Sequence, residues 1–536
     1  MAYAHSRDAD TQRHGSHTLG VAAGNGFDTQ WRGVAYESDI CVVSNAVSAD
    51  TIYISKGQRD LYTSATDVLG FKYIFDYAAS VGKPCVISFS EGSPYSFSDD
   101  VQLFNEVMGK MTGPGRIFVA SAGNESLRGA KTYFCKQPAQ EREGTFLFDS
   151  GERLLVNMLS ADEFSLSLQV YNGEQPVTFS MPSRDIIADS DSLIMDTVQV
   201  DNTEYVIFWN AFTPTGNFGK KLVYQVYVKG PRYIGHSQPI ALVLEGKEAE
   251  VEVFKYIGSF GTNDANPELA AGQTSHNVLM PGSSPHAICV GATAYRRGFI
   301  DADGKYRSAP YGQNGSWASY SGVGPTPEGY VKPDVVANGT NVYSSGSSYY
   351  YEANGTTGLE TGYSTYNGRT YPWFADLGTS MAAPVVAGII ALWLEAKPDL
   401  TREEIMGVLD RPCRHPDTSL SYPNNSYGYG EIDVYAGLLD ILGINTIREV
   451  SRQQSAARVG VTDGQLVVSL PSEATSHLRL RIYTTSGRLV ADRQLPAHQT
   501  IYTIRLPHLP TGIYAAQLDG PSALRGSTLV RIPSPL

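Results

Sequence analysis

The sequence contains few cysteines and few charged residues for its length. Five cysteines occur in 536 residues, an odd number, and charged residues make up 18% of the chain. The cysteines are scattered, so neither a disulfide framework nor the ligand spacing of a zinc site can be read from them. They are Cys41, Cys85, Cys135, Cys289 and Cys413. Those at 41, 85 and 289 stand in apolar runs typical of strands, and we expect them to be buried packing residues.

A hydrophobic run long enough to cross a membrane is also missing. The apolar segment 381–394 is shorter than the ~20 residues of a spanning helix, so no membrane span is predicted. Residues 1–8 have no apolar core, and we expect no signal peptide in this chain. The net charge of −13 argues against nucleic acid or an anionic membrane as the main partner.

The first part of the chain alternates helical and strand-like patterns. Helices are expected at 14–24, 66–81 and 99–111, and buried strands at 39–44, 84–89 and 117–120. Continuous apolar strands separated by helices indicate the α/β class, with a parallel sheet covered by helices on both faces. The total length exceeds what one core can hold, so two to four domains are expected.

The pattern changes to a period of two between about 128 and 275. Strands are expected at 164–170, 204–210, 222–228, 239–244 and 250–256. Turn residues separate these strands, which predicts an antiparallel β-sandwich inserted between two halves of the α/β domain. The α/β pattern then resumes with strands at 287–293 and 333–337.

Two later segments differ from this pattern. Residues 344–371 are rich in Gly, Ser, Tyr and Asn, which favours a long surface loop, either a mobile decoration or part of a substrate groove. Residues 445–458 are polar and are interpreted as a linker. Beyond the linker, short strands over 459–536 predict a small all-β domain, large enough to fold alone.

A serine begins the most apolar helical segment. Residues 378–384, GTSMAAP, lead into a run that is apolar on every face, which predicts a buried helix with Pro384 in its first turn. The hydroxyl of Ser380 would lie at the positive end of the helix dipole, among free backbone N–H groups. That position suits a nucleophile whose attack creates an oxyanion. An ordinary N-capping serine is the alternative interpretation.

Two further polar residues are candidates for the same chemistry. His14 could act as the base, although a metal pair with His17 is a competing interpretation, for which no third or fourth ligand is evident. Asn124 follows a buried strand, where its amide could point into a cleft at the carboxyl edge of the sheet. An asparagine in such a turn can also be purely structural.

Three motifs resemble those of one family. Residues 378–384 resemble the nucleophile signature of the subtilisin-like serine proteases, the subtilases. Residues 14–20 resemble the histidine motif of this family, with Ser16 in place of a threonine. Residues 121–124 resemble its oxyanion segment. The resemblance implies a subtilisin-like sheet, with Ser380 as nucleophile, His14 as base and Asn124 as oxyanion donor. It also implies protein or peptide substrates.

The resemblance extends to substrate-binding segments. Residues 90–93 resemble the segment that pairs with an extended substrate backbone and lines the first specificity pocket, although Glu91 and Ser93 depart from the family pattern. The implied substrate-binding residues are Ser90, Glu91, Gly92, Ser121, Ala122 and Gly123. Glu91 and Glu125 are either solvated carboxylates or the source of a preference for a basic substrate residue. No cofactor or metal site is predicted, and structural calcium cannot be read from the sequence.

The family's triad aspartate has no clear counterpart. The family carries it upstream of the histidine in an Asp-Thr-Gly or Asp-Ser-Gly turn, whereas 13 residues precede His14 here and none resembles that turn. Asp8 and Asp10 lie in a hydrophilic leader, and Asp376 is expected on the strand before Ser380. Two hypotheses follow: a secreted endopeptidase, or a truncated or catalytically silent relative that binds peptides or glycans. We expect the aspartate segment and a signal peptide to have been lost together.

The end of the chain resembles a different module. Residues 482–490, 509–514 and 528–532 are similar to the secretion-and-sorting tail of exported Bacteroidetes proteins. This implies a secreted or cell-surface location and the secretion machinery as a partner. The expected domains are the two catalytic segments 1–127 and 276–444, the insert 128–275, the linker 445–458 and the sorting domain 459–536.

Overall fold

The computed structural model describes two compact units, residues 1–437 and 438–536. In the first unit it describes residues 12–44, 64–173, 175–188 and 194–437. In the second it describes residues 438–444, 458–462, 465–470, 473–484, 488–505, 509–510, 512–520 and 526–532. The boundary falls within α8 (Val434–Ile441). Asp8 and Asp10 lie outside the described residues.

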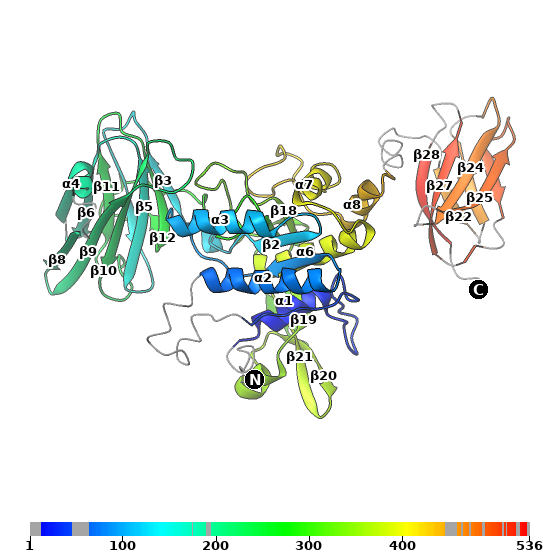
Figure 1. The fold of residues 1–536 in the computed structure, drawn as a ribbon, viewed down its shortest axis with the longest axis horizontal. Helices are drawn as coiled ribbons and strands as arrows, with labels where there is room; N and C mark the ends of the chain where they lie inside the picture. Colours follow the sequence, from blue (N-terminus) through cyan, green and yellow to red (C-terminus); the bar gives the residue numbers. More distant parts are fainter. Residues whose placement is uncertain are drawn as a thin grey trace. The chain divides into compact units, whose positions relative to one another are not determined.

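A parallel sheet forms the centre of the first unit (Figure 1). Its order is β1-β2-β14-β17, and β18 pairs with β14. Strands β1, β2, β14 and β18 are mutually parallel, whereas β17 runs antiparallel to β14. Their bounds are Cys85–Phe89 (β1), Arg116–Ser121 (β2), Ile288–Ala294 (β14), Ser316–Trp317 (β17) and Val335–Asn338 (β18).

Helices pack on this sheet largely where the sequence predicts them. They are α1 (His14–Ala23), α2 (Ser64–Ser80), α3 (Asp99–Met111) and α6 (Thr379–Ala396); α7 (Arg402–Asp410) follows. Helices α2 and α3 bury Phe71, Phe104 and Met108 in one cluster with Phe118 of β2. Helix α6 packs against β1, β2, β14, β18 and α1.

The buried helix α6 is longer than the apolar run predicts. It has 18 residues, and among the described helices it is the one apolar and long enough to cross a membrane. Of these 18 residues, 67% are buried inside the fold. Its apolar faces therefore pack against protein, as in the core helix of a folded domain.

The prediction of a strand at residues 39–44 is wrong. This segment is not part of any sheet, and Ile40 and Val42 are 51% and 65% exposed. A strand forms only when a neighbour satisfies its backbone groups, and the described chain offers no strand beside this segment. Cys41 is therefore only partly buried, like Cys85 on β1, whereas Cys289 is fully buried as expected.

Two antiparallel sheets lie between β2 and β14 in the sequence. One has the order β3-β12-β5-β10-β9-β8, and the other β13-β4-β11-β6-β7. The strands are β3 (Tyr133–Lys136), β4 (Arg142–Phe148), β5 (Arg153–Ser160), β6 (Ser165–Tyr171), β7 (Pro176–Pro182), β8 (Ile194–Val200), β9 (Thr203–Phe212), β10 (Leu222–Lys229), β11 (Ile240–Glu245), β12 (Val251–Ile257) and β13 (Ser259–Gly261), with α4 (Ser183–Ala188) after β7.

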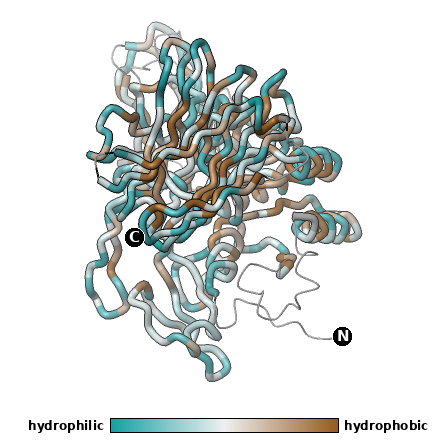
Figure 2. Tube along the Cα trace, turned by 90° about the vertical axis from the view of Figure 1, so that its left-hand side faces the viewer, coloured by the Kyte–Doolittle hydropathy of each residue, from teal (hydrophilic) through white to brown (hydrophobic). Residues whose placement is uncertain are grey.

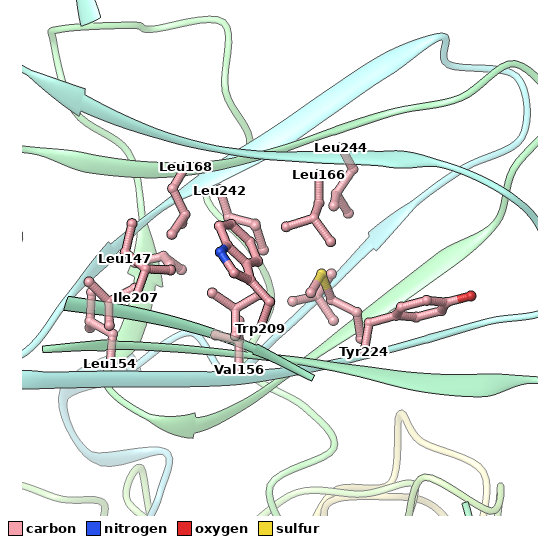
Figure 3. Packing of buried hydrophobic residues seen from close by; sticks show 14 of the residues in the cluster. Leu147, Leu154, Val156, Leu166, Leu168, Ile207, Trp209, Tyr224, Leu242 and Leu244 are labelled. Carbon is pink, nitrogen blue, oxygen red and sulfur yellow. The ribbon is translucent and has the colours of Figure 1, made fainter. Parts of the chain in front are cut away.

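These two sheets share one hydrophobic core. Trp209 of β9 lies between them, facing Leu166 and Leu242 of the opposite sheet (Figure 3). Its indole N–H donates to Asp196 at 3.2 Å, so its one polar atom is satisfied. Figure 2, in which this part of the chain faces the viewer, shows hydrophobic residues along the strands and hydrophilic residues in the loops. Each large apolar side chain buried here contributes about 1.5–3 kcal/mol.

The prediction of a long surface loop at residues 344–371 is also wrong. The segment contains α5 (Ser348–Asn354) and β20 (Glu360–Tyr366), and β20 pairs with β21 (Arg369–Asp376), which also pairs with β19 (Val342–Ser345). Asn367 and Gly368 have φ values of 48° and 76°, as a two-residue hairpin turn of type I′ requires. The sequence contains these turn residues. The Gly- and Tyr-rich composition of the segment favours a loop, however, so it does not predict the strands on either side of the turn.

The second unit has its own core. Its two sheets are β22-β23-β26 and β25-β24-β27-β28. Their bounds are Arg458–Thr462 (β22), Gln465–Ser469 (β23), Leu478–Thr484 (β24), Leu489–Leu495 (β25), Ile501–Ile504 (β26), Gly512–Asp519 (β27) and Gly526–Ile532 (β28). Val468, Leu480, Ile482 and Ala516 are completely buried in a single cluster. Most of the predicted linker, 445–457, lies outside the described residues.

Because each unit has its own core, we expect a chain ending near residue 452 to keep the α/β fold. Thermal unfolding followed by circular dichroism should show one cooperative transition for the shortened chain. The full-length chain, measured in parallel, should show the same transition and that of the second unit. Precipitation or loss of cooperative melting after truncation would mean that the second unit belongs to the main core.

Candidate active site

Ser380 lies in the first turn of α6, at the carboxyl edge of the parallel sheet. The helix is preceded by Gly378, whose φ of 142° is unfavourable for any residue with a side chain. The Gly378 N–H donates to the Gly339 carbonyl at 2.9 Å. Ser380 is half-buried, and its Oγ donates to the Ser90 carbonyl at 3.3 Å, while the Ser90 hydroxyl donates to the Ser380 carbonyl at 2.9 Å. The end of β1 therefore holds the serine in place.

The side chain of Asn124 is oriented by the residue before this serine. Its Oδ1 accepts from the Thr379 N–H at 3.0 Å and from the Thr379 hydroxyl at 3.2 Å. The Thr379 hydroxyl in turn accepts from the Gly123 N–H at 3.0 Å. These bonds use Oδ1, and the amide Nδ2 lies near Gly378, where a Cβ would be 3.2 Å from it. Asn124 itself is exposed, so its donor is accessible.

His14 is the first residue of α1, which rests on β19. The Ser344 hydroxyl donates to the His17 carbonyl at 2.9 Å, and the Ser345 hydroxyl donates to the Ser16 carbonyl at 3.3 Å. Gly20 permits this approach, because a Cβ there would lie 2.3 Å from the Ser344 hydroxyl. Helix α1 also packs against α6, so the elements that carry His14 and Ser380 are in contact. His14 is half-buried.

His17 lies behind His14 in the interior. It is completely buried, with Nε2 3.4 Å from the Phe374 carbonyl. Burial lowers the pKa of His17 to about 4, against the opposing effect of the Asp376 carboxylate. Its imidazole is therefore neutral at physiological pH, and it acts as a packing residue between α1 and β21.

Asp376 ends β21, on the strand before Ser380 as predicted. Its carboxylate forms an ion pair with Arg13 at 2.9 Å and accepts from the Leu377 N–H at 2.9 Å. The Arg13 guanidinium also lies over the Phe374 ring, 4.2 Å from its centroid. This carboxylate is thus held in place by Arg13.

The predicted substrate-binding segments lie on either side of Ser380. Residues 90–92 follow β1 and are half-buried or exposed, whereas residues 121–123 are buried at the end of β2. Glu91 is exposed as a residue, but partial burial of its carboxyl raises its pKa, with a smaller effect from Asp67. Glu125 is not free, because it forms an ion pair with Lys255 of β12. Because the charge of Glu125 is already paired with Lys255, Glu125 is less able to attract a basic substrate residue.

Two residues near the site were missed by sequence reasoning. Thr379 was read only as part of the serine motif, although it orients Asn124. Leu279 lies close to Gly92 and Gly123, between the two predicted substrate-binding segments. It stands in no periodic segment, so only the folded structure could reveal its position.

Comparison with known proteins places the chain in a family. The sequence pattern of peptidase S8, described as the subtilase family, matches residues 2–189 and 241–430. The chain therefore belongs to the subtilase family. The unmatched segment 190–240 contains the whole of β8, β9 and β10.

Similar individual proteins match over shorter stretches. The serine protease AprX of Bacillus subtilis (strain 168) is 32% identical over 165 residues, which are 30% of this chain and 32% of AprX. The uncharacterized protein aq_aa18 of Aquifex aeolicus (strain VF5) is 32% identical over 170 residues, 32% of this chain and 69% of that protein. The match thus spans about a third of AprX.

A solved structure extends the likeness of fold. The CspB protease of Clostridium perfringens superimposes with a TM-score of 0.56 at 20% sequence identity, and the match covers 81% of each chain. The coverage includes much more than the parallel sheet. The subtilisin-like arrangement of helices and sheets is therefore shared, and the low identity limits the likeness to the fold.

Proposed function

We propose that this chain is a serine endopeptidase in which Ser380 is the nucleophile, His14 the general base and Asn124 an oxyanion donor. One observation carries the proposal: Ser380 stands at the amino end of the buried helix α6, directly after the residue that aligns the amide of Asn124. Membership of the subtilase family and the likeness to the serine protease AprX support it.

The chemistry follows from this arrangement. His14 takes the proton of the Ser380 hydroxyl as Oγ attacks the substrate carbonyl, and a tetrahedral intermediate forms. The Nδ2 of Asn124 and the backbone N–H of Ser380 donate to its oxyanion. His14 then protonates the leaving amine, and an acyl-enzyme remains on Ser380. Water hydrolyses the acyl-enzyme with His14 as the base.

Substrate binding would use main-chain pairing. We propose that an extended peptide lies along Ser90, Glu91 and Gly92, with Ser121, Ala122 and Gly123 forming the opposite wall. Pairing through backbone groups gives affinity without strong sequence preference. Protein or peptide substrates are therefore the proposed partners.

A second candidate is a truncated or catalytically silent relative that binds peptides or glycans at the cell surface. The observation that favours it is the ion pair between Asp376 and Arg13, since the family's serine mechanism needs a carboxylate on the base histidine. Measured turnover of a peptide substrate separates the two candidates.

We also propose export of the protein. The separate C-terminal unit resembles a secretion-and-sorting tail, so the secretion machinery is its proposed partner and the cell surface or exterior its location. Deleting this unit in the native host should leave the protein inside the cell.

In a form of the protein with the complete active site, we expect Asn124→Ala to lower kcat by ~10²–10³-fold with little change in KM, because the amide donates to an oxyanion that exists only after attack. This size is the one known for the oxyanion asparagine of subtilisin, a member of the same family. Steady-state kinetics on a chromogenic peptide would measure it. Asn172→Ala, on the exposed turn after β6, is the matched control and should leave both constants unchanged. A change confined to KM would contradict the assignment.

A further inference from the structure

A hollow of about 260 Å³ lies on the six-stranded sheet of the insert, far along the chain from Ser380. Its lining comes from the neighbouring strands β5, β10 and β9 (Figure 1). The lining residues are Leu155, Phe208, Asn210, Gln225 and Tyr227. The alternate residues Val156, Trp209 and Val226 are buried in the core between the two sheets. Since side chains alternate along a strand, the hollow is on the face that the second sheet does not cover.

An apolar row forms one side of this hollow. Tyr227 of β10 pairs with Leu155 of β5 and with Phe208 of β9, so the three side chains share one face of the sheet. The ring centroids of Phe208 and Tyr227 are 5.6 Å apart. Met195 of β8 is opposite Phe208 and 59% exposed, and it continues the row. The row therefore presents aromatic ring surface to a ligand.

A row of amides lies beside the apolar row. Gln225 pairs with Asn157 on one side and with Asn210 on the other. The Gln225 Nε2 donates to the Asn157 Oδ1 at 2.9 Å. Asn157 is 1% exposed, and its Nδ2 has no hydrogen-bond partner within the described part of the chain. Buried donors are normally paired, so this unpaired amide next to the hollow favours a polar partner from outside the chain.

These two rows match the chemistry of a sugar. A pyranose ring has C–H groups that pack on an aromatic ring, and hydroxyls around its edge. Amide side chains both donate and accept hydrogen bonds, as hydroxyls do. None of the residues that line the hollow is charged, which disfavours a ligand that carries phosphate. A peptide main chain would find no free strand edge, because β5, β10 and β9 each have a strand on both sides.

We propose that this hollow binds an uncharged oligosaccharide, with one sugar ring packed on Tyr227 and Phe208 and its hydroxyls bonded to Gln225 and Asn210. The hollow is smaller than the ~300–1,000 Å³ of pockets that enclose a whole small molecule, so it suits one unit of a longer sugar chain.

The insert holds this site in a fixed place on the α/β domain. Leu159 and Val223, one row further along β5 and β10, lie in the same hydrophobic cluster as Phe104 of α3 and Met280. A bound sugar chain would therefore retain the α/β domain at a surface that carries glycans. The inference does not depend on the proposed function, because binding of a sugar requires no turnover at Ser380.

The test measures binding of the full-length chain to an array of neutral hexasaccharides, made of glucose, mannose, galactose, xylose or N-acetylglucosamine. At least one of them should bind, and isothermal titration calorimetry then gives its Kd. Tyr227→Ala should raise this Kd at least ~10-fold, because the aromatic surface under the sugar ring is lost. Asn210→Ala, which removes one amide at the rim, should raise it ~3–10-fold.

The matched control is Tyr233→Ala. Tyr233 lies in the loop after β10 and is 55% exposed, and its removal should leave the Kd unchanged. Thermal unfolding of each variant shows whether its fold is intact. If Tyr227→Ala lowers the melting temperature, Tyr227→Phe, which should keep the affinity, and Asn210→Ala decide instead.

Three results would overturn the proposal. The first is that no hexasaccharide of the array binds. The second is that a bound hexasaccharide has the same Kd for the wild-type chain, Tyr227→Ala and Asn210→Ala, which would place it elsewhere on the molecule. The third is that unfolded casein peptides, and no sugar, bind in a way that Tyr227→Ala abolishes, which would make the hollow a peptide site.

Discussion

In a form of the protein with the complete active site, including the triad carboxylate, replacing Ser380 with alanine should abolish covalent labelling by a fluorophosphonate and lower kcat by about 10⁶-fold, the size known for the nucleophile of subtilisin. Only an activated serine reacts with this reagent. The Ser380 hydroxyl lies in the first turn of α6, where the helix dipole favours the negative charge that develops during attack. Removing the hydroxyl leaves the oxyanion donors in place but no group to form the acyl-enzyme.

Labelling followed by peptide mapping would locate the modified residue, and kinetics on a chromogenic peptide would measure kcat. Ser80→Ala, at the exposed end of α2, removes a serine hydroxyl far along the chain from the site and should change neither result. Equal labelling of Ser380→Ala and the wild-type chain would exclude Ser380 as the nucleophile. It would favour the peptide- or glycan-binding alternative.

Adding an upstream segment that carries an Asp-Thr-Gly or Asp-Ser-Gly turn should raise kcat by about 10⁴-fold. That is the known cost of losing the triad carboxylate, which holds the histidine in the correct tautomer and stabilises the imidazolium. Asp376 is held by Arg13. An added strand could pair with β1, which is at the edge of its sheet and has no strand on its outer side within the described residues. Such pairing would cover the open edge, so aggregation should decrease as well.

A matched control separates the two effects of such an extension. The same added segment with asparagine in place of its aspartate should restore solubility, measured by size-exclusion chromatography, without restoring turnover. Turnover of the 536-residue chain at the rate of the aspartate-containing form would overturn this prediction. In that case another carboxylate serves His14.

The sequence alone was sufficient for the local features of this protein. The apolar run after Ser380 predicted a buried helix, and α6 covers it, because a segment apolar on all faces is stable only inside a core. Helices α2 and α3 and strands β1, β2, β14 and β18 lie within a few residues of their predicted positions, since hydrophobic periodicity is a property of neighbouring residues. The serine motif also identified the family that the comparison confirms.

Tertiary contacts decided the rest. Residues 39–44 have the composition of a buried strand, but strand formation depends on a partner that the composition cannot supply. Residues 344–371 have the composition of a loop, yet they include β20, which pairs with β21 in a hairpin. The ion pairs of Asp376 with Arg13 and of Glu125 with Lys255 join residues more than 100 positions apart. Leu279 is an ordinary leucine in the sequence; only the fold brings it close to both Gly92 and Gly123, which follow two different strands.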